Sequence, residues 1–224
     1  MMRILVINPN RSEACGAGIA AAISPFARPG GTLLDVVSLP DGPPAIYSWA
    51  DWHAAVGPIL RRIAADPADA YIIACASDPG IEAARAATAA PVFGIFRAAV
   101  AAAVARAERF GILAIVEASK ARHRAALRAM GLETRLAATE ALNVSMDRLL
   151  DPTAARAALV AAARACAAGG AETIILGCTG MAHHRRAVED AAGVPVIEPC
   201  QQAAALALAA LEGGPVSRQG GGAA

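Results

Sequence analysis

The sequence has a single lysine, Lys120, no long hydrophobic run and no excess of either charge. Pyridoxal phosphate enzymes need a Schiff-base lysine, so this cofactor is not expected. No apolar run reaches the roughly 18 residues that a membrane-spanning helix requires. Lys and Arg together number 20, against 19 Asp and Glu. We therefore expect no membrane and no nucleic acid among the partners of this chain.

The cysteines lack the spacing of a metal site or a disulfide framework. The chain has five of them: Cys15, Cys75, Cys166, Cys178 and Cys200. Their number is odd and none forms a C-x-x-C pair, so we expect free thiols and no metal. A P-loop is also missing. The first residues lack the layout of a signal peptide, so the expected location is the cytoplasm.

One glycine pattern is similar to a dinucleotide-binding turn. Gly16, Gly18 and Ala21 form G-x-G-x-x-A, and Asp35 follows at about 20 residues, as such a site requires. The first predicted strand ends near Ile7, however. The glycines then fall inside the following helix and not in the turn that grips the phosphates, so we expect no nicotinamide cofactor.

The most informative feature is a stretch that occurs twice. Residues 69–75 (DAYIIAC) align with 172–178 (ETIILGC), and 90–93 (APVF) align with 194–197 (VPVI). An apolar run followed by a helical segment is typical of a buried parallel strand that leads into a crossover. The duplication therefore predicts two similar lobes, with a cysteine just past the end of a strand in each.

The whole chain alternates apolar, strand-like runs with Ala-rich helical segments, which favours an α/β fold with parallel sheets. The predicted strands are 4–7, 32–37, 70–74, 91–94, 111–116, 173–176 and 195–197. We expect the first lobe at 1–95, joined by a last helix at 199–212, and the second at 96–198. The glycine-rich end, 213–224, is predicted to be a flexible tail.

Cys75 and Cys178 are the leading candidates for chemistry. Each follows the carboxyl end of a strand, where open α/β sheets bind ligands. A buried cysteine there is ordinarily an inert small hydrophobe, but the matched positions favour two sulfurs that flank one small molecule. A thiol at a helix N-terminus has a lowered pKa and is a usable base.

The remaining candidates have weaker signals. Cys15 and Cys166 lie in Ala-rich helical stretches and are expected to pack. Cys200 follows a strand end and aligns with Phe96, so this pair is expected to line the pocket. Two further groups of side chains near the predicted site have two interpretations each. His183 and His184 either lie on the surface or point into the site, with a surface position expected. Tyr47, Trp49 and Trp52 either belong to the core or form a lid over a substituent of the substrate.

Three segments resemble the signature of the hydantoin racemase branch of the aspartate/glutamate racemase superfamily. They are Ile7-Asn8-Pro9-Asn10 with Ser12, Ala74-Cys75 with Ser77-Asp78-Pro79-Gly80, and Leu176-Gly177-Cys178-Thr179-Gly180-Met181-Ala182. The resemblance spans nearly the whole chain. It implies two pseudo-symmetric flavodoxin-like lobes with the active site in the cleft between them. It also implies cofactor-independent racemisation, in which one cysteine removes a proton as thiolate and the other delivers one as thiol.

On this resemblance Cys75 and Cys178 are the catalytic residues. Asn8 and Ser12, with the backbone N–H groups after each cysteine, would hold the ring carbonyl that gains charge in the enolate. The implied substrate-binding residues are Asn8, Ser12, Ala76, Ser77, Asp78, Thr179 and Gly180.

The substrate expected on this branch is a neutral cyclic ureide, a 5-substituted hydantoin or allantoin. A site that contains the Asp78 carboxylate should bind the two carboxylates of aspartate or glutamate poorly unless cations compensate. Asp78 has a second interpretation, as the N-cap of the following helix. The chain departs from the branch at Ala76, where an aromatic is frequent, and at Arg97, where a glutamate is common. Arg97 either serves a carboxylate substrate or is solvated.

Other functions stay open at this point. An aspartate/glutamate-type racemase, a maleate isomerase or an arylmalonate decarboxylase would use a related site, although the decarboxylase typically keeps only the second cysteine. A non-catalytic small-molecule-binding protein is the alternative outside enzymes. We expect a small-molecule substrate and a homo-oligomer.

Overall fold

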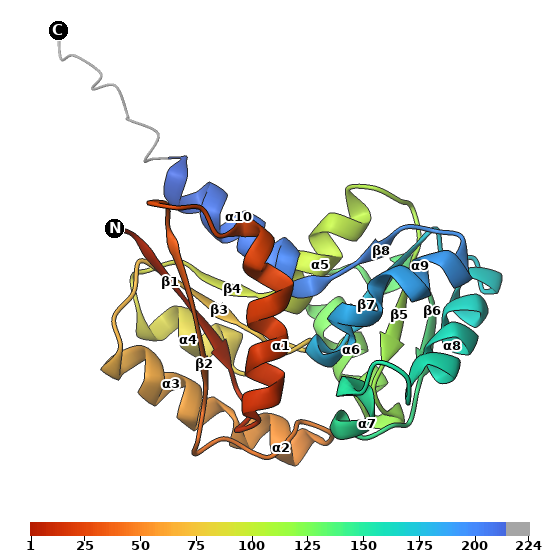
Figure 1. Ribbon diagram of the computed structural model, residues 1–224, viewed down its shortest axis with the longest axis horizontal. Helices are drawn as coiled ribbons and strands as arrows, with labels where there is room; N and C mark the ends of the chain where they lie inside the picture. The colour runs from red at the N-terminus through yellow and green to blue at the C-terminus, as the bar shows by residue number, and fades with distance from the viewer. Residues whose placement is uncertain (214–224) are drawn as a thin grey trace, which may run out of the picture.

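The structure, a computed structural model, describes residues 1–213, and this part of the chain forms two four-stranded sheets (Figure 1). The strand order is β2-β1-β3-β4 in the first sheet and β6-β5-β7-β8 in the second, and all these pairings are parallel. The strands are β1 (Arg3–Asn8), β2 (Leu33–Ser38), β3 (Ala70–Ile73), β4 (Val92–Gly94), β5 (Phe110–Ala114), β6 (Leu136–Ala141), β7 (Thr173–Gly177) and β8 (Val196–Ile197). The matching order confirms the predicted α/β fold with two similar lobes.

Helices connect and cover the strands. They are α1 (Glu13–Ile23), α2 (Trp49–Ala54), α3 (Val56–Ala65), α4 (Ile81–Ala87), α5 (Ile95–Val104), α6 (Glu117–Ala129), α7 (Met146–Leu150), α8 (Arg156–Ala168), α9 (Arg185–Ala192) and α10 (Pro199–Glu212), with short 3-10 turns η1 (Ser24–Phe26), η2 (Glu133–Arg135) and η3 (Thr179–His184). Among the helices of residues 1–213, none has the length and apolar character needed to span a membrane.

The central strands follow from their apolar runs. Residues 4–7 of β1 and all of β3, β5 and β7 are buried, as expected for parallel strands covered on both faces. The edge strand β6 was not predicted, because its sequence LAATEA is only half-buried and has no apolar run. The strand expected to reach residue 116 ends at Ala114.

The two lobes share a core. One apolar cluster contains Ile4 and Ile72 from the first sheet together with Ile112 and Ile175 from the second. Helix α10 packs against α1, α5, β3 and β4, and Figure 1 shows it beside α5 at the junction of the lobes. The last helix therefore contacts both sheets, and its assignment to the first lobe remains our proposal. The lobe limits 1–95 and 96–198 remain our proposal, and the tail predicted at 213–224 lies, from residue 214, outside the described residues.

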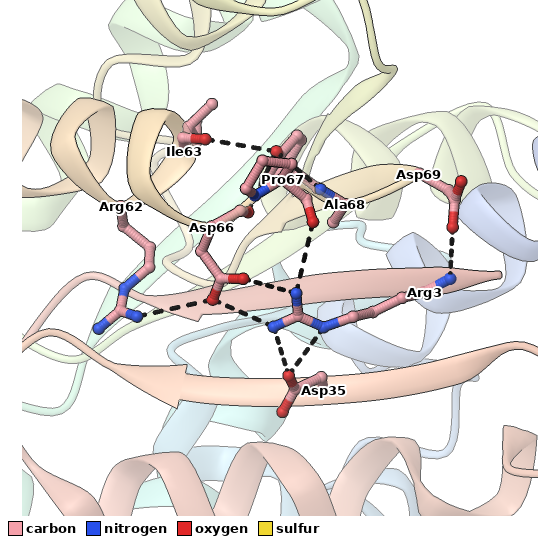
Figure 2. A network of polar contacts seen from close by, with 9 residues as sticks. Arg3, Asp35, Arg62, Ile63, Asp66, Pro67, Ala68 and Asp69 are labelled. Atoms are coloured by element: carbon pink, nitrogen blue, oxygen red, sulfur yellow. Dashed lines mark hydrogen bonds and ion pairs between the residues drawn. The ribbon is translucent and has the colours of Figure 1, made fainter. Parts of the chain in front are cut away.

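A polar network on Arg3 ties the amino end of the first sheet together (Figure 2). The guanidinium of Arg3 pairs with Asp35 on β2 and with Asp66 after α3, each at 2.6 Å. The backbone N–H of Arg3 donates to Asp69 just before β3. These bonds raise the pKa of Arg3 and lower the pKa of Asp66. Asp35 is thus occupied by an ion pair, and Gly16 and Gly18 lie inside α1, as predicted.

Candidate active site

Cys75 and Cys178 follow equivalent strands. Each comes after the third strand in the order of its sheet, β3 for Cys75 and β7 for Cys178. Both line one small cavity between the lobes, with a volume of about 30 Å³. Its walls are formed by Asn10, Ile46, Ala74, Cys75, Ala76, Ser77, Ile115, Ser119, Arg122, Met146, Gly177, Cys178 and Thr179. The duplication therefore brings the two predicted thiols to a single site.

The expected lowering of the thiol pKa is not found in this cavity. Burial raises the pKa of Cys75 to about 12, against smaller opposing effects of Ser77 and Arg122. Burial likewise raises the pKa of Cys178, despite hydrogen bonds from Gly180 and Thr179. The helix argument fails for Cys75 because the chain turns first, with Ser77 and Asp78 N–H groups donating to the Cys75 carbonyl, and α4 begins only at Ile81.

Three of the predicted binding residues reach the cavity: Ala76, Ser77 and Thr179. Ser77 Oγ lies 3.9 Å from Cys75 Sγ. Thr179 Oγ1 lies 3.2 Å from the buried thiol of Cys15. Cys15, which was expected only to pack, thus touches a side chain of the cavity wall.

Asn8 and Ser12 support the cavity without lining it. The Asn8 amide nitrogen donates to the Asn10 side chain, to the Ser12 carbonyl and to Ser38 Oγ, each at 3.1 Å. Ser12 Oγ accepts from the Cys15 N–H and caps α1. The side chain that reaches the cavity from this loop is Asn10. The N-P-N segment therefore does reach the cavity, through its second asparagine and not through Asn8.

Asp78 does not line the cavity of the two cysteines, and it does not cap α4, whose N-cap is Gly80. Its carboxylate turns toward α5 and accepts from the Phe96 N–H at 2.8 Å, the Arg97 N–H at 3.0 Å and Arg97 Nη1 at 3.1 Å. Burial raises the pKa of Asp78 to about 6, against these bonds. Arg97 also pairs with Glu82 at 2.5 Å. Arg97 therefore forms ion pairs with two carboxylates of the protein. It is neither free to bind a carboxylate substrate nor a fully solvated residue.

Three further predicted residues lie away from the cavity. Phe96 is fully buried and stacks on His123 with ring centroids 5.0 Å apart. Cys200 lies in the first turn of α10 and is buried in the shared core. Gly180 packs behind the site, close to Met146. A pocket lining was expected for Phe96 and Cys200 from their alignment alone, and their side chains point into the core instead.

The two histidines after Cys178 have different environments. His183 is exposed, as predicted. His184 is 3% exposed, and its Nε2 lies 3.0 Å from the Leu149 carbonyl. The prediction of a surface position is therefore wrong for His184, because the 3-10 turn η3 directs it inward.

The aromatic residues after β2 lie at the edge of the site. The Trp52 indole donates to the Ser77 carbonyl at 3.2 Å, and the Tyr47 hydroxyl accepts from the Met146 N–H at 2.6 Å. Trp49 and Trp52 line a second cavity that shares Ser77 and Arg122 with the first. Trp52 also packs against an apolar core cluster, as the core interpretation expects, whereas Trp49 is exposed. A role as a lid remains our proposal.

Helix α6 supplies functional candidates that sequence reasoning missed. Ser119 and Arg122 line the cavity, and His123 lies directly behind the Cys75 loop, with Nε2 at 2.7 Å from the Ala76 carbonyl. The segment lies outside the repeated stretches, and its charged residues look like the solvated face of a surface helix. No local pattern distinguishes Arg122 from its exposed neighbour Arg124.

Comparisons with known proteins agree with this architecture. The sequence model of the Asp/Glu/Hydantoin racemase family matches residues 4–207. The chain is 34% identical to hydantoin racemase of Paenarthrobacter aurescens over 212 residues, 92% of this chain and 89% of that protein. It is also 34% identical over 203 residues to hydantoin racemase of Pseudomonas sp. (strain NS671), 88% of this chain and 81% of that one.

Solved structures show the same fold. Allantoin racemase from Klebsiella pneumoniae superposes with a TM-score of 0.84 at 32% identity, covering 95% of this chain and 89% of that one. Glutamate racemase from Bacillus anthracis superposes at 0.72 over 95% of this chain and 82% of its own, with 19% identity, which shows the fold alone. The family match and the curated relatives confirm the resemblance seen in the cysteine segments. The chain belongs to the Asp/Glu/hydantoin racemase family.

Proposed function

We propose that this protein is a cofactor-independent racemase of 5-substituted hydantoins or allantoin, and that Cys75 and Cys178 are its two bases. The observation that carries the proposal is the shared cavity, into which equivalent strands of the two lobes each bring one thiol. One sulfur, as thiolate, takes the proton from the stereocentre. The other, as thiol, gives its proton to the opposite face, so that the inverted product leaves with the protonation states of the thiols exchanged.

The polar groups of the cavity fit a neutral ring better than an amino acid. Asn10, Ser77 and Thr179 offer amide and hydroxyl groups to ring N–H and C=O groups. Among the described residues of the wall there is no carboxylate to pair with an ammonium group. Asp78 does not disfavour a dicarboxylic amino acid in the way that the sequence had suggested, since its carboxylate points to α5.

The similarity to hydantoin and allantoin racemases supports the same substrate class. One observation favours the aspartate/glutamate alternative, namely the guanidinium of Arg122 in the wall. Both of its terminal nitrogens already donate to backbone or hydroxyl oxygens, however, so no two-pronged donor is free for a carboxylate. The cytoplasmic location and the homo-oligomer expected from the sequence remain proposals.

A chiral chromatography assay tests the proposal. Purified protein without added cofactor is incubated separately with each enantiomer of 5-benzylhydantoin, 5-methylhydantoin, allantoin, aspartate and glutamate. Spontaneous racemisation is subtracted with the Cys75→Ser, Cys178→Ser double variant. We expect inversion of at least one cyclic ureide and of neither amino acid. Turnover of aspartate or glutamate alone would establish the alternative, and binding without any inversion would indicate a non-catalytic binding protein.

A further inference from the structure

Arg122 is a buried cation held between the two lobes. It is only 3% exposed, although it lies on α6 of the second lobe. Its Nη1 donates to the Tyr47 carbonyl at 3.0 Å, and its Nη2 donates to the Ile46 carbonyl at 3.3 Å and to Ser119 Oγ at 2.9 Å. Carbonyls of the first lobe thus fix a guanidinium that the second lobe supplies.

This cation has no counter-ion among the described residues. None of the ion pairs found there includes Arg122, and its Nε has no hydrogen-bond partner among them. The Asp51 carboxylate accepts hydrogen bonds from the Tyr47 and Ser48 N–H groups and forms no ion pair with Arg122. Its charge raises the pKa of Arg122 only by a longer-range Coulomb interaction. A buried charge without a partner costs several kcal/mol. An anion in the cavity would offset that cost.

The cavity wall holds two groups that can become anions, the thiols. The charged and titratable groups that act on Cys75 are Arg122, Asp78 and Cys15, and Cys178 lines the same cavity. Asp78 is negative and already paired with Arg97, and the neighbouring thiols are neutral or negative. Arg122 is therefore the positive group in this set. His123 packs behind the same loop with a pKa lowered by burial to about 4, so it adds no charge at neutral pH.

We propose that Arg122 is a positioning residue whose charge, held at the cavity by the Ile46 and Tyr47 carbonyls, stabilises the thiolate form of Cys75. This proposal rests on the two-thiol mechanism above. It also gives a reason for the arginine to be retained in the interface of the lobes, where a neutral side chain of similar length would be less costly to bury. The same charge is near any oxygen that becomes negative when the stereocentre loses its proton.

The test measures thiolate formation directly. Alkylation of Cys75 by iodoacetamide is followed by peptide mass spectrometry from pH 6 to 11 in the wild type, Arg122→Gln, Arg122→Lys and the matched control Arg124→Gln. Arg124 is exposed two residues further along α6 and does not line the cavity. Since the thiolate is the reactive form, we expect alkylation at pH 7 to slow about tenfold or more in Arg122→Gln, equivalent to one pKa unit. Arg122→Lys should lie between, and Arg124→Gln should match the wild type.

An Arg122→Gln profile that coincides with the wild type would overturn the proposal, even if racemisation falls, because a purely structural role lowers turnover without shifting the profile. Arg122→Met serves if circular dichroism shows that Arg122→Gln is unfolded. Failure of both variants to fold would assign the residue to stability alone and would also reject the proposal. Alkylation needs no turnover, so a shifted profile in a protein that racemises nothing would contradict the proposed function and not the role of Arg122.

Discussion

The Nε2 atom of His123 lies 2.7 Å from the carbonyl oxygen of Ala76, which joins α6 of the second lobe to the loop that carries Cys75 in the first. A carbonyl only accepts, so Nε2 carries a proton in this hydrogen bond. Burial lowers the pKa of His123 to about 4, which keeps it neutral at physiological pH. The bond therefore fixes the Cys75 loop without placing a second charge beside Arg122.

Acidification should weaken the protein through His123. The folded-state pKa of about 4 lies below the ordinary value of 6.5, so the unfolded chain binds more protons between these limits. Stability from this residue is then complete above pH 6.5 and falls as the pH drops toward 4. In His123→Gln the loss of unfolding free energy, relative to wild type, should shrink by about 2 kcal/mol between pH 7 and pH 4.5. Urea unfolding at both values measures it, and a difference independent of pH would contradict it.

Asp78 and Glu82 bind the same arginine but should differ in their effect on stability. Asp78 is fully buried and accepts three hydrogen bonds at the start of α5, whereas the Glu82 side chain is 71% exposed. Asp78→Ala leaves two N–H groups of α5 without an acceptor and removes one of the two carboxylates that pair with the part-buried Arg97, so we expect a loss of about 3 kcal/mol of unfolding free energy. Glu82→Gln should cost less than about 1 kcal/mol. Denaturant titration compares the two, and equal losses would be inconsistent with Asp78 as the buried acceptor for the first N–H groups of α5.

Trp49 should select among substrates by size. Its side chain is among the large exposed hydrophobic ones and lines the cavity next to the two cysteines. If the ring substituent extends past Ser77 into that cavity, Trp49→Ala removes apolar contact only for large substituents. We expect KM to rise about tenfold for 5-benzylhydantoin, from the loss of about 1.4 kcal/mol, and to stay constant for 5-methylhydantoin. Leu206→Ala, at another exposed apolar residue, is the control. Equal changes for both hydantoins would exclude this direction for the substituent.

Local patterns were sufficient to predict the fold and the meeting of the two thiols. Apolar runs marked the buried strands, and the duplication placed Cys75 and Cys178 at equivalent strand ends, which a symmetric pair of sheets must bring together. Strand β6 was not predicted, because a half-buried edge strand does not require an apolar run.

The remainder of the site depends on contacts that are distant in sequence. Arg122 is 75 residues from the Tyr47 carbonyl that holds it, and His123 is 47 residues from Ala76. Asp78 lies close to Cys75 in the chain, yet its carboxylate finds better donors at the free N–H groups of α5. Asp78 was expected in the site because it is close to Cys75 in sequence, and Cys200 because it aligns with Phe96. Neither kind of evidence indicates α6. Such side-chain directions are decided by packing between elements, which periodicity does not record.

The two thiols should be distinguishable by isotope exchange. Because the incoming proton comes from an exchangeable thiol, the wild type in D₂O should place deuterium at the stereocentre of the inverted product. Cys75→Ser and Cys178→Ser should each abolish racemisation, since a serine hydroxyl without an activating partner is a far weaker base. Each variant should still exchange the proton of one enantiomer, the one whose C–H faces the remaining thiol. Cys166→Ser, which changes a buried thiol on α8 outside the cavity, should racemise like the wild type. Mass spectrometry of the separated enantiomers reads out both effects, and near-native racemisation in both single variants would place the chemistry elsewhere.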